Sequence, residues 1–303
     1  MKTKIVTDTI SSSKTIGEAF QNTRAILKHA GFTAFESDTE ALFGYLLRMN
    51  KSDIYIHHAR KLTRNEVCQL QGMLDKRLKQ VPIQYITHRQ EFMGLNFYTQ
   101  EEVLIPRSET EILVEKVLEL LNSNNSPECL KIIDLGTGTG IIAVSIAYYF
   151  KNVIVFATDI SEKAIGIAQK NAMKHQCMEK ITFLSGNLFK VFENRILTNN
   201  IDGIVANPPY IPKNEIQFLP DEIKEHEPHI ALNGGIEGLD YFLKIIQKSC
   251  DYLKKDGFLA MEMGIGQAKK IKKILLQNET YNEKIEIIKD YSGVERVIVA
   301  YKK

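Results

Sequence analysis

The sequence IDGIVA at residues 201–206 runs directly into NPPY at residues 207–210. The first stretch is short and largely apolar, which predicts a buried strand. Proline cannot donate to a sheet ladder and holds φ at about −65°, so the strand must end where the two prolines begin. The junction therefore predicts a stiff corner at the carboxyl end of a strand, which is where open α/β sheets bind their ligands.

This corner offers two hydrogen-bond acceptors close together, the side-chain oxygen of Asn207 and the carbonyl oxygen of Pro208. Pro209 has no N–H, so no neighbouring donor competes for that carbonyl. Two fixed acceptors suit a planar NH2 group, such as an amide or the exocyclic amine of a base, and Tyr210 could supply a flat face for stacking. The alternative is a turn that only ends a strand, because Asn-Pro is a common turn signal.

Strands and helices alternate on both sides of the corner, and a polar stretch at 211–237 interrupts them. We expect strands at 131–135, 153–158, 181–184, 201–206, 257–263, 285–289 and 296–301, and helices at 109–121, 141–150, 162–175, 239–253 and 267–276. This alternation predicts an α/β fold with a doubly wound, largely parallel sheet and helices on both faces. A connection as long as 211–237 is usually functional or disordered.

A second motif, DLGTGTG at residues 134–140, lies between the first of these strands and its helix. Glycines there allow a tight turn and a close approach to a ligand, although turns also use glycine for steric reasons alone. Asp159 ends the next strand, where a carboxylate can accept both hydrogens of a ribose diol, or can instead cap the helix after Ser161. No Walker lysine follows the loop, so a nucleoside without phosphates fits best, and S-adenosylmethionine is the candidate cofactor.

The chain before the sheet predicts a small helical bundle over residues 1–82. A capping box at Thr63–Glu66 opens a helix that reaches about Lys79, and 37–40 offers cap residues for a helix beginning at Ala41. Residues 83–105 contain strand-like runs at 84–86, 91–93, 95–98 and 103–105, with a turn at Gly94, which predicts a β-hairpin linker to a catalytic domain at 106–303.

Charge, cysteine content and the lack of long apolar runs limit the classes of protein to which this chain can belong. The chain has 303 residues and a net charge of +2, while residues 1–88 hold 13 Lys and Arg against 8 Asp and Glu, a balance of +5 that leaves −3 for the rest. The basic part could favour RNA, a ribosomal or an acidic protein partner, or could be a solvated helix face. Four scattered cysteines and the adjacent His57 and His58 do not predict a metal site, and no membrane span or signal peptide is expected, which indicates a cytoplasmic protein.

Together, DLGTGTG, Asp159 and NPPY resemble class I (Rossmann-like) methyltransferases that act on planar amino groups. Further stretches resemble the HemK/PrmC family in particular. They are PIQYI at 82–86, EFMG at 91–94, LIPRSETE at 104–111, and the segment from Glu227-Pro228 to Tyr241. The Arg-Ser at 107–108 departs mildly from the commoner Arg-Pro of that family.

The resemblance implies an S-adenosylmethionine-dependent enzyme that methylates the side-chain amide nitrogen of the glutamine in the Gly-Gly-Gln motif of peptide-chain release factors. It also implies that Asp159 holds the cofactor's ribose, and that Asn187 and Leu188 lie near its adenine, although Leu188 offers no stacking ring. The other implied cofactor residues are Gly136, Thr137, Gly138, Thr139, Gly140 and Asn207. The implied catalytic residues are Asn207, Pro208 and Tyr210, and the implied substrate residues are these three with Pro209.

The chemistry of the corner agrees with this assignment. An amide nitrogen is a poor nucleophile because its lone pair is delocalised, and two acceptors on its hydrogens would orient it and favour developing positive charge. The implied partner is a release factor, with neither nucleic acid nor membrane, and a monomer is expected. The alternatives are a DNA or RNA adenine-N6 methyltransferase, whose flipped base presents the same planar amine, and a nucleotide-sensing protein without catalysis.

Overall fold

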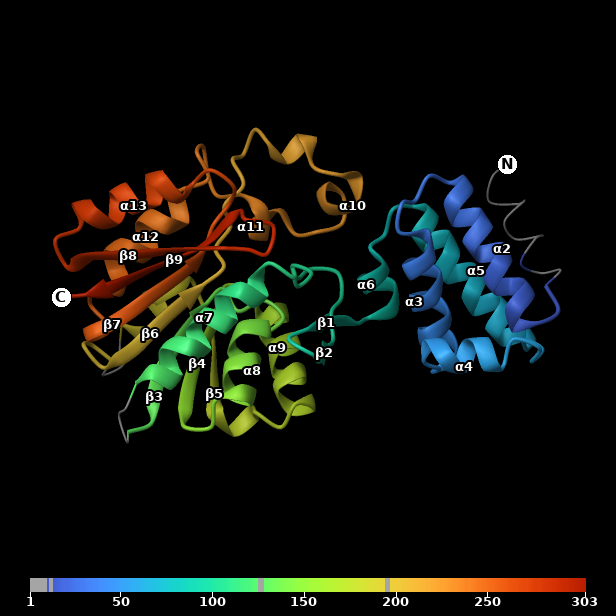
Figure 1. Ribbon diagram of the computed structural model, residues 1–303, viewed down its shortest axis with the longest axis horizontal. Helices are drawn as coiled ribbons and strands as arrows, with labels where there is room; N and C mark the ends of the chain where they lie inside the picture. Colours follow the sequence, from blue (N-terminus) through green and yellow to red (C-terminus); the bar gives the residue numbers. More distant parts are fainter. Residues whose placement is uncertain (1–9, 11–12, 125–127, 194–196) are drawn as a thin grey trace. The chain divides into compact units, whose positions relative to one another are not determined.

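The computed structural model describes residues 10, 13–124, 128–193 and 197–303 (Figure 1). The chain divides into two compact units. One contains residues 1–89 together with 221–226, and the other contains 90–220 together with 227–303. The segment 221–226 therefore belongs to the amino-terminal unit, although it is far from that unit in sequence.

The amino-terminal unit is helical, as predicted. Its helices are α2 (Ile16–His29), α3 (Phe35–Leu47), α4 (Lys51–Ile56), α5 (Arg64–Leu78), α6 (Ile83–Thr87) and α10 (Asp221–Lys224). The capping box is confirmed, because the Thr63 side chain accepts from Glu66 N and the Glu66 side chain accepts from Thr63 N. The helices enclose an apolar core that includes Leu27, Leu42, Phe43, Leu70 and Leu74.

The predicted cap at 37–40 is wrong, because α3 begins at Phe35 and these residues lie inside it. Asp38 is buried and accepts from Nε of Arg77 at 2.8 Å. Nη1 of Arg77 lies 3.1 Å from Glu222 of α10, and the guanidinium stacks on the Phe32 ring at 4.3 Å. The local sequence suggests that Asp38 caps a helix, but in the structure Asp38 forms a buried ion pair with Arg77, which is far away in the sequence.

The predicted linker is partly wrong. Residues 83–87 form helix α6, in which Tyr85 and Ile86 are buried and Thr87 Oγ1 donates to the Ile83 carbonyl. Only β1 (Gln90–Phe92) and β2 (Leu95–Phe97) pair as a hairpin, around a turn with positive φ at Met93 and Gly94. Residues 103–105 form no strand, because the Ile105 N–H donates to the Glu227 carboxylate instead of to a neighbouring strand.

The second unit is built on a seven-stranded sheet in the order β5-β4-β3-β6-β7-β9-β8. Its strands are β3 (Leu130–Leu135), β4 (Val153–Asp159), β5 (Ile181–Ser185), β6 (Ile201–Ala206), β7 (Leu253–Glu262), β8 (Tyr281–Lys289) and β9 (Glu295–Lys302). All neighbouring pairs from β5 to β7 are parallel, and β9 is antiparallel to both of its neighbours. The predicted doubly wound α/β sheet is confirmed.

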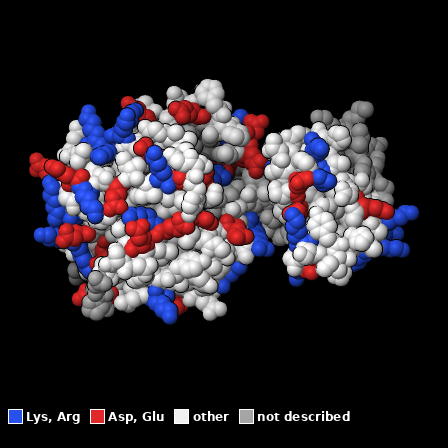
Figure 2. All heavy atoms as spheres, in the orientation of Figure 1, with Lys and Arg blue, Asp and Glu red and all other residues white. Residues whose placement is uncertain are grey.

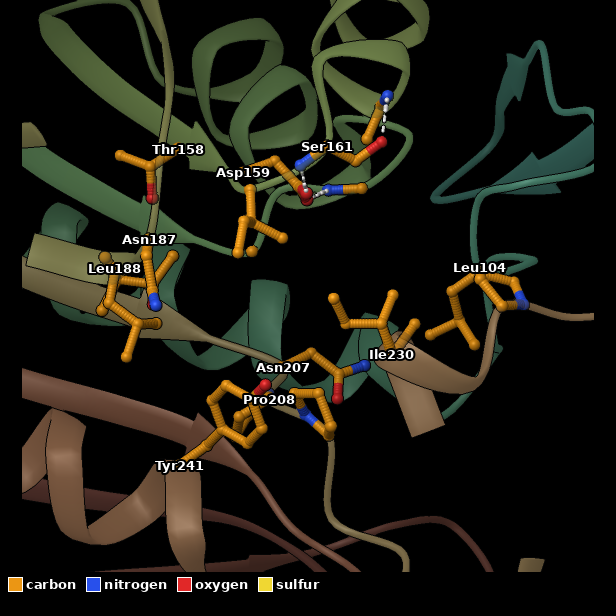
Figure 3. A pocket seen from close by; sticks show the side chains of 18 of the residues that line it. Leu104, Thr158, Asp159, Ser161, Asn187, Leu188, Asn207, Pro208, Ile230 and Tyr241 are labelled. Atoms are coloured by element: carbon orange, nitrogen blue, oxygen red, sulfur yellow. Dashed lines mark hydrogen bonds between the residues drawn. The ribbon is translucent and has the colours of Figure 1, made fainter. Parts of the chain in front are cut away.

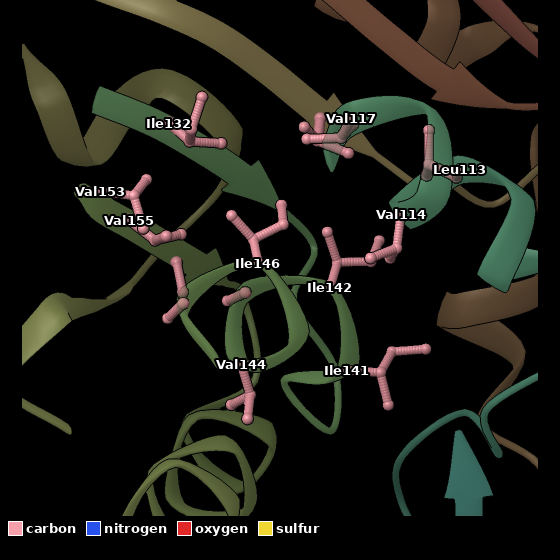
Figure 4. Close-up of a cluster of buried hydrophobic side chains, with 14 of the residues drawn as sticks. Leu113, Val114, Val117, Ile132, Ile141, Ile142, Val144, Ile146, Val153 and Val155 are labelled. Atoms are coloured by element: carbon pink, nitrogen blue, oxygen red, sulfur yellow. The ribbon is translucent and has the colours of Figure 1, made fainter. Parts of the chain in front are cut away.

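Successive residues of the central strands face opposite sides of the sheet, and both sides are buried. Ile132 packs in one core with α7 (Thr110–Ser123), α8 (Ile141–Tyr149) and α9 (Glu162–Lys174), and Figure 4 shows part of this cluster. Ile133 packs in the other core with α12 (Asp240–Ser249) and α13 (Ala268–Gln277). The predicted helices are therefore present, although α12 ends at Ser249 and β7 already begins at Leu253.

The polar stretch after the corner holds only short helices, η3 (Ile216–Phe218), α10 and α11 (His229–Leu232). Its start is held in place by hydrogen bonds from Ile211 N to the Leu232 carbonyl and from Gly234 N to the Ile211 carbonyl. In the part of the chain that the structure describes, no helix combines the length and apolar character needed to cross a bilayer.

Candidate active site

The strand order places the predicted motifs next to one another at the carboxyl ends of the central strands. β3 has β4 on one side and β6 on the other, so the direction of winding reverses at this strand. The last residue of β3, Leu135, pairs in register with Ala206 of β6 and with Thr158 of β4. The glycine loop, Asp159 and the NPPY corner therefore leave the sheet side by side, at the topological switch point where such folds bind ligands.

Asp134 shapes the glycine loop. Its Oδ2 accepts from Thr137 Oγ1 at 2.6 Å and from Ala143 N at 3.2 Å, and its side chain is fully buried. Burial raises the pKa of this carboxyl from 3.8 to about 7. The N–H groups of Gly136 and Thr137 both donate to the Thr158 carbonyl at 2.8 Å, so the loop is also tied to the end of β4.

Asp159 closes the loop from the other side. Its Oδ2 accepts from Gly138 N and its Oδ1 from Ser161 N, both at 2.9 Å (Figure 3). The cap of α9 is made by the Ser161 side chain, which accepts from Ala164 N. Each Asp159 oxygen keeps a further lone pair for a ligand diol. Burial raises the pKa of Asp159.

These segments surround a cavity of about 970 Å³, a volume that includes its open mouth. In Figure 3, Asp159, Asn187 and Leu188 lie across the open space from Asn207 and Ile230. The predicted residues that line the cavity are Gly136, Gly138, Asp159, Asn187, Leu188, Asn207, Pro208 and Pro209. Leu104, Ile230, Tyr241 and Lys244 also line it and were not assigned to the site, although the first three lie within stretches that carry the family resemblance.

Three predicted loop residues do not line this cavity. Thr137 and Thr139 are buried inside the loop. Gly140, with φ +84°, is the residue before α8, and a Cβ at this position would lie 3.0 Å from the Cβ of Ala168 on α9. The structure thus gives Gly140 a packing function between two helices.

Hydrogen bonds and close packing on the side away from the cavity fix the conformation of the NPPY corner. Nδ2 of Asn207 donates to Thr110 Oγ1 at 3.1 Å, so Oδ1 is the acceptor left for a ligand. Nε2 of Gln267 donates to the Tyr210 carbonyl at 2.9 Å. A Cβ on Gly234 would lie 2.7 Å from the Pro209 carbonyl oxygen, so only glycine permits this approach of the following loop.

Tyr210 lies away from the cavity that the other motif residues line. Its hydroxyl is 3.5 Å from Oε1 of Glu262, and its ring lies against Gly264. With Gln267 and Arg296 it lines a different hollow. Burial raises the pKa of the phenol, so Tyr210 is neutral at physiological pH.

An ion pair joins two flanks of the cavity. Glu227 is buried, accepts from Nη2 of Arg107 at 2.5 Å and accepts from Ile105 N at 3.3 Å. Leu104 on one side and Pro228 on the other both line the cavity. Glu227 therefore fixes the two segments that carry these walls.

Residues 18–87 match the family model described as PrmC N-terminal domain, and residues 109–234 match that described as methyltransferase small domain. The release factor glutamine methyltransferase of Clostridium acetobutylicum is 36% identical over 94% of this chain and 98% of its own length. That of Fusobacterium nucleatum is 37% identical over 94% of this chain and 78% of its own. A solved structure of a release-factor-specific protein-(glutamine-N5) methyltransferase, from Alicyclobacillus acidocaldarius, is 25% identical, covers 66% of this chain and 94% of its own, and has a TM-score of 0.41.

Proposed function

Since this chain belongs to the release factor glutamine methyltransferase family, we propose that it transfers a methyl group from S-adenosylmethionine to the glutamine side-chain amide nitrogen in the Gly-Gly-Gln motif of release factors. The modification would support translation termination. The enzyme would work as a monomer in the cytoplasm, where release factors act. The proposal rests above all on the in-register pairing of Leu135 with Ala206. This pairing brings the glycine loop, which suits a nucleoside, beside the NPPY corner, which suits a planar amide.

The cavity residues suit S-adenosylmethionine. The Asp159 carboxylate has lone pairs left for the ribose hydroxyls, and Gly136 and Gly138 expose backbone where a methionine moiety would lie. Asn187 lines the cavity and offers an amide to an adenine amine, and Leu188 offers an apolar contact. When bound, the cofactor supplies an electrophilic methyl group on a sulfonium.

The corner would bind the substrate amide through two hydrogen-bond acceptors. Oδ1 of Asn207 and the Pro208 carbonyl would accept the two N–H hydrogens of the substrate amide and orient its nitrogen toward the methyl group. Both acceptors also favour positive charge developing on that nitrogen, so positioning and electrostatic stabilisation come from the same two atoms. After transfer the nitrogen carries the methyl group and both of its hydrogens, and this cationic amide is strongly acidic and can lose one proton to water, so no general base is needed. Tyr210 would hold the corner in shape through Glu262 and Gly264.

The substrate can be identified by labelling. The full chain is incubated with methyl-labelled S-adenosylmethionine and either a release factor, the same factor with its Gly-Gly-Gln glutamine replaced by alanine, or DNA and RNA. We expect label only on the unaltered factor. Label on nucleic acid instead would support the adenine-N6 alternative. On the face drawn in Figure 2, acidic and basic side chains are interspersed over the larger unit, without a basic stripe of the kind that tracks a nucleic-acid backbone.

The helical unit predicted at 1–82 would dock the release factor away from its glutamine. Hydrogen exchange of the full chain with and without the factor tests this function. We expect slower exchange within residues 13–82 in the complex. Slower exchange confined to residues 90–220 and 227–303 would contradict docking by the helical unit.

A further inference from the structure

Behind the Asn207 side chain lie two buried polar residues that make none of the proposed contacts with the substrate or the cofactor. Thr110, the first residue of α7, is fully buried and accepts from Asn207 Nδ2 at 3.1 Å. The Thr110 side chain also lies within reach of the Glu262 carboxyl and lowers its pKa by hydrogen bonding, and Glu262 is 1% exposed at the end of β7. β7 lies beside β6, with Met261 paired to Ala206, so the carboxyl lies directly behind the corner.

The direction of these hydrogen bonds decides how the Asn207 amide faces. A hydroxyl has one hydrogen, and a carboxylate can only accept. Thr110 must therefore donate to Glu262, and the Thr110 oxygen is then left to accept from Asn207. Only the NH2 end of the amide can satisfy that oxygen, so the carbonyl end remains for the cavity. An apolar residue at position 110 would let the amide take either orientation.

We propose that Thr110 and Glu262 are positioning residues that hold the Asn207 amide with Oδ1 toward the substrate. The inference rests on the proposed function, because it explains how the acceptor that grips the glutamine amide is kept in its productive orientation. A flipped amide would present NH2 to the substrate NH2, and two donors would repel one another.

The ionisation of Glu262 should control this orientation. Burial raises the pKa of the carboxyl from 4.5 to about 7, with Arg296 lowering it and Glu109 raising it, and Tyr210 also faces it. Within the described residues, Oε2 of Glu262 has no hydrogen-bond partner. Once protonated, the carboxyl can donate to Thr110, the hydroxyl is free to donate to Asn207, and the amide can turn. Turnover should therefore fall as the pH drops through about 7.

Two substitutions at one position separate positioning from packing. Thr110→Val keeps the volume and removes the hydroxyl, and Thr110→Ser keeps the hydroxyl and removes a methyl group. We expect Thr110→Val to lower kcat on the release factor by about ten- to a hundredfold, with the Kd for S-adenosylmethionine within about threefold of wild type, and Thr110→Ser to keep most of the turnover. Ser145→Ala is the control, because Ser145 is also fully buried in the same unit and its Oγ has no partner among the described residues.

The outcomes distinguish this inference from the proposed function. If wild type methylates the factor and Thr110→Val is as active, or Thr110→Ser is the more impaired variant, the positioning function is wrong and the proposed function is unaffected. If wild type does not methylate the factor, the proposed function is wrong. The pH profile is the second readout. The acid limb of kcat near pH 7 should disappear in Glu262→Gln, and an unchanged limb in that variant would contradict control by Glu262.

Discussion

Replacement of Gly140 by alanine tests whether this residue packs helices together or binds the cofactor. In the structure it has φ +84°, and an added Cβ would lie 3.0 Å from the Cβ and 3.1 Å from the Cα of Ala168. The left-handed conformation costs an L-residue about 1–2 kcal/mol, and overpacking adds about 1–3 kcal/mol. We therefore expect Gly140→Ala to lower the free energy of unfolding by about 2–5 kcal/mol.

The matched control is Gly166→Ala on the facing helix α9. Gly166 lies in the helix interior, and an added Cβ would meet no atom within 4 Å. Alanine should stabilise the helix there by about 0.5–1 kcal/mol. Urea unfolding of the full chain measures both changes, and hydrogen exchange in α8 and α9 assigns them to this unit.

Binding of S-adenosylmethionine to the same variants completes the test. If Gly140 acts only through packing, the folded fraction of Gly140→Ala should bind the cofactor within about threefold of wild type, because tenfold weaker binding would need about 1.4 kcal/mol of lost contact. A variant that unfolds like wild type but binds the cofactor much more weakly would refute the packing function, and would support the contact expected from sequence.

Three further predictions follow from buried charges. Asp38→Ala should lower the free energy of unfolding by about 3–5 kcal/mol in urea, because Arg77 loses its most buried partner; a loss under about 1 kcal/mol would mean that Glu222 alone is sufficient. The folded-state pKa of Asp134 is raised from 3.8 to about 7, so its contribution to stability is present below pH 4 and is lost as the pH rises to about 7. The stability of wild type relative to Asp134→Asn should thus fall by a few kcal/mol across that range, at ~1.4 kcal/mol per pKa unit, and a flat difference would contradict it. Glu227→Gln weakens the ion pair with Arg107 and should raise the KM for both S-adenosylmethionine and the release factor. Glu225→Gln, on the exposed surface, is the control. An unchanged KM in Glu227→Gln would show that the cavity walls do not depend on this ion pair.

Sequence reasoning predicted most of the sheet, because most strands contain an apolar run bounded by turn residues and each such signal lies within about ten residues. It also placed Asp159 and the corner each at the carboxyl end of a strand, and the carboxyl ends of parallel strands lie on the same side of a sheet. It failed at 83–87, where an apolar run without clear alternation fits a helix as well as a strand, and Pro82 precedes a helical turn.

The remaining parts of the site could not be predicted, because they depend on contacts between residues far apart in the chain. Thr110 is separated from Asn207 by 97 residues, and Glu227 is separated from Arg107 by 120. Neither threonine nor glutamate has a local pattern that marks such a partner. The start of α7 brings Thr110 to Asn207, and the register of β6 against β7 brings Glu262 next to the corner.

We expect the corner after β6 to hold a planar NH2 group beside the cavity. The most direct measurement compares kcat on a release factor with the Kd for S-adenosylmethionine in Asn207→Ala. We expect kcat to fall by about a hundredfold or more while the Kd changes by less than about threefold. Equal losses in turnover and in cofactor affinity, or turnover close to that of wild type, would contradict it.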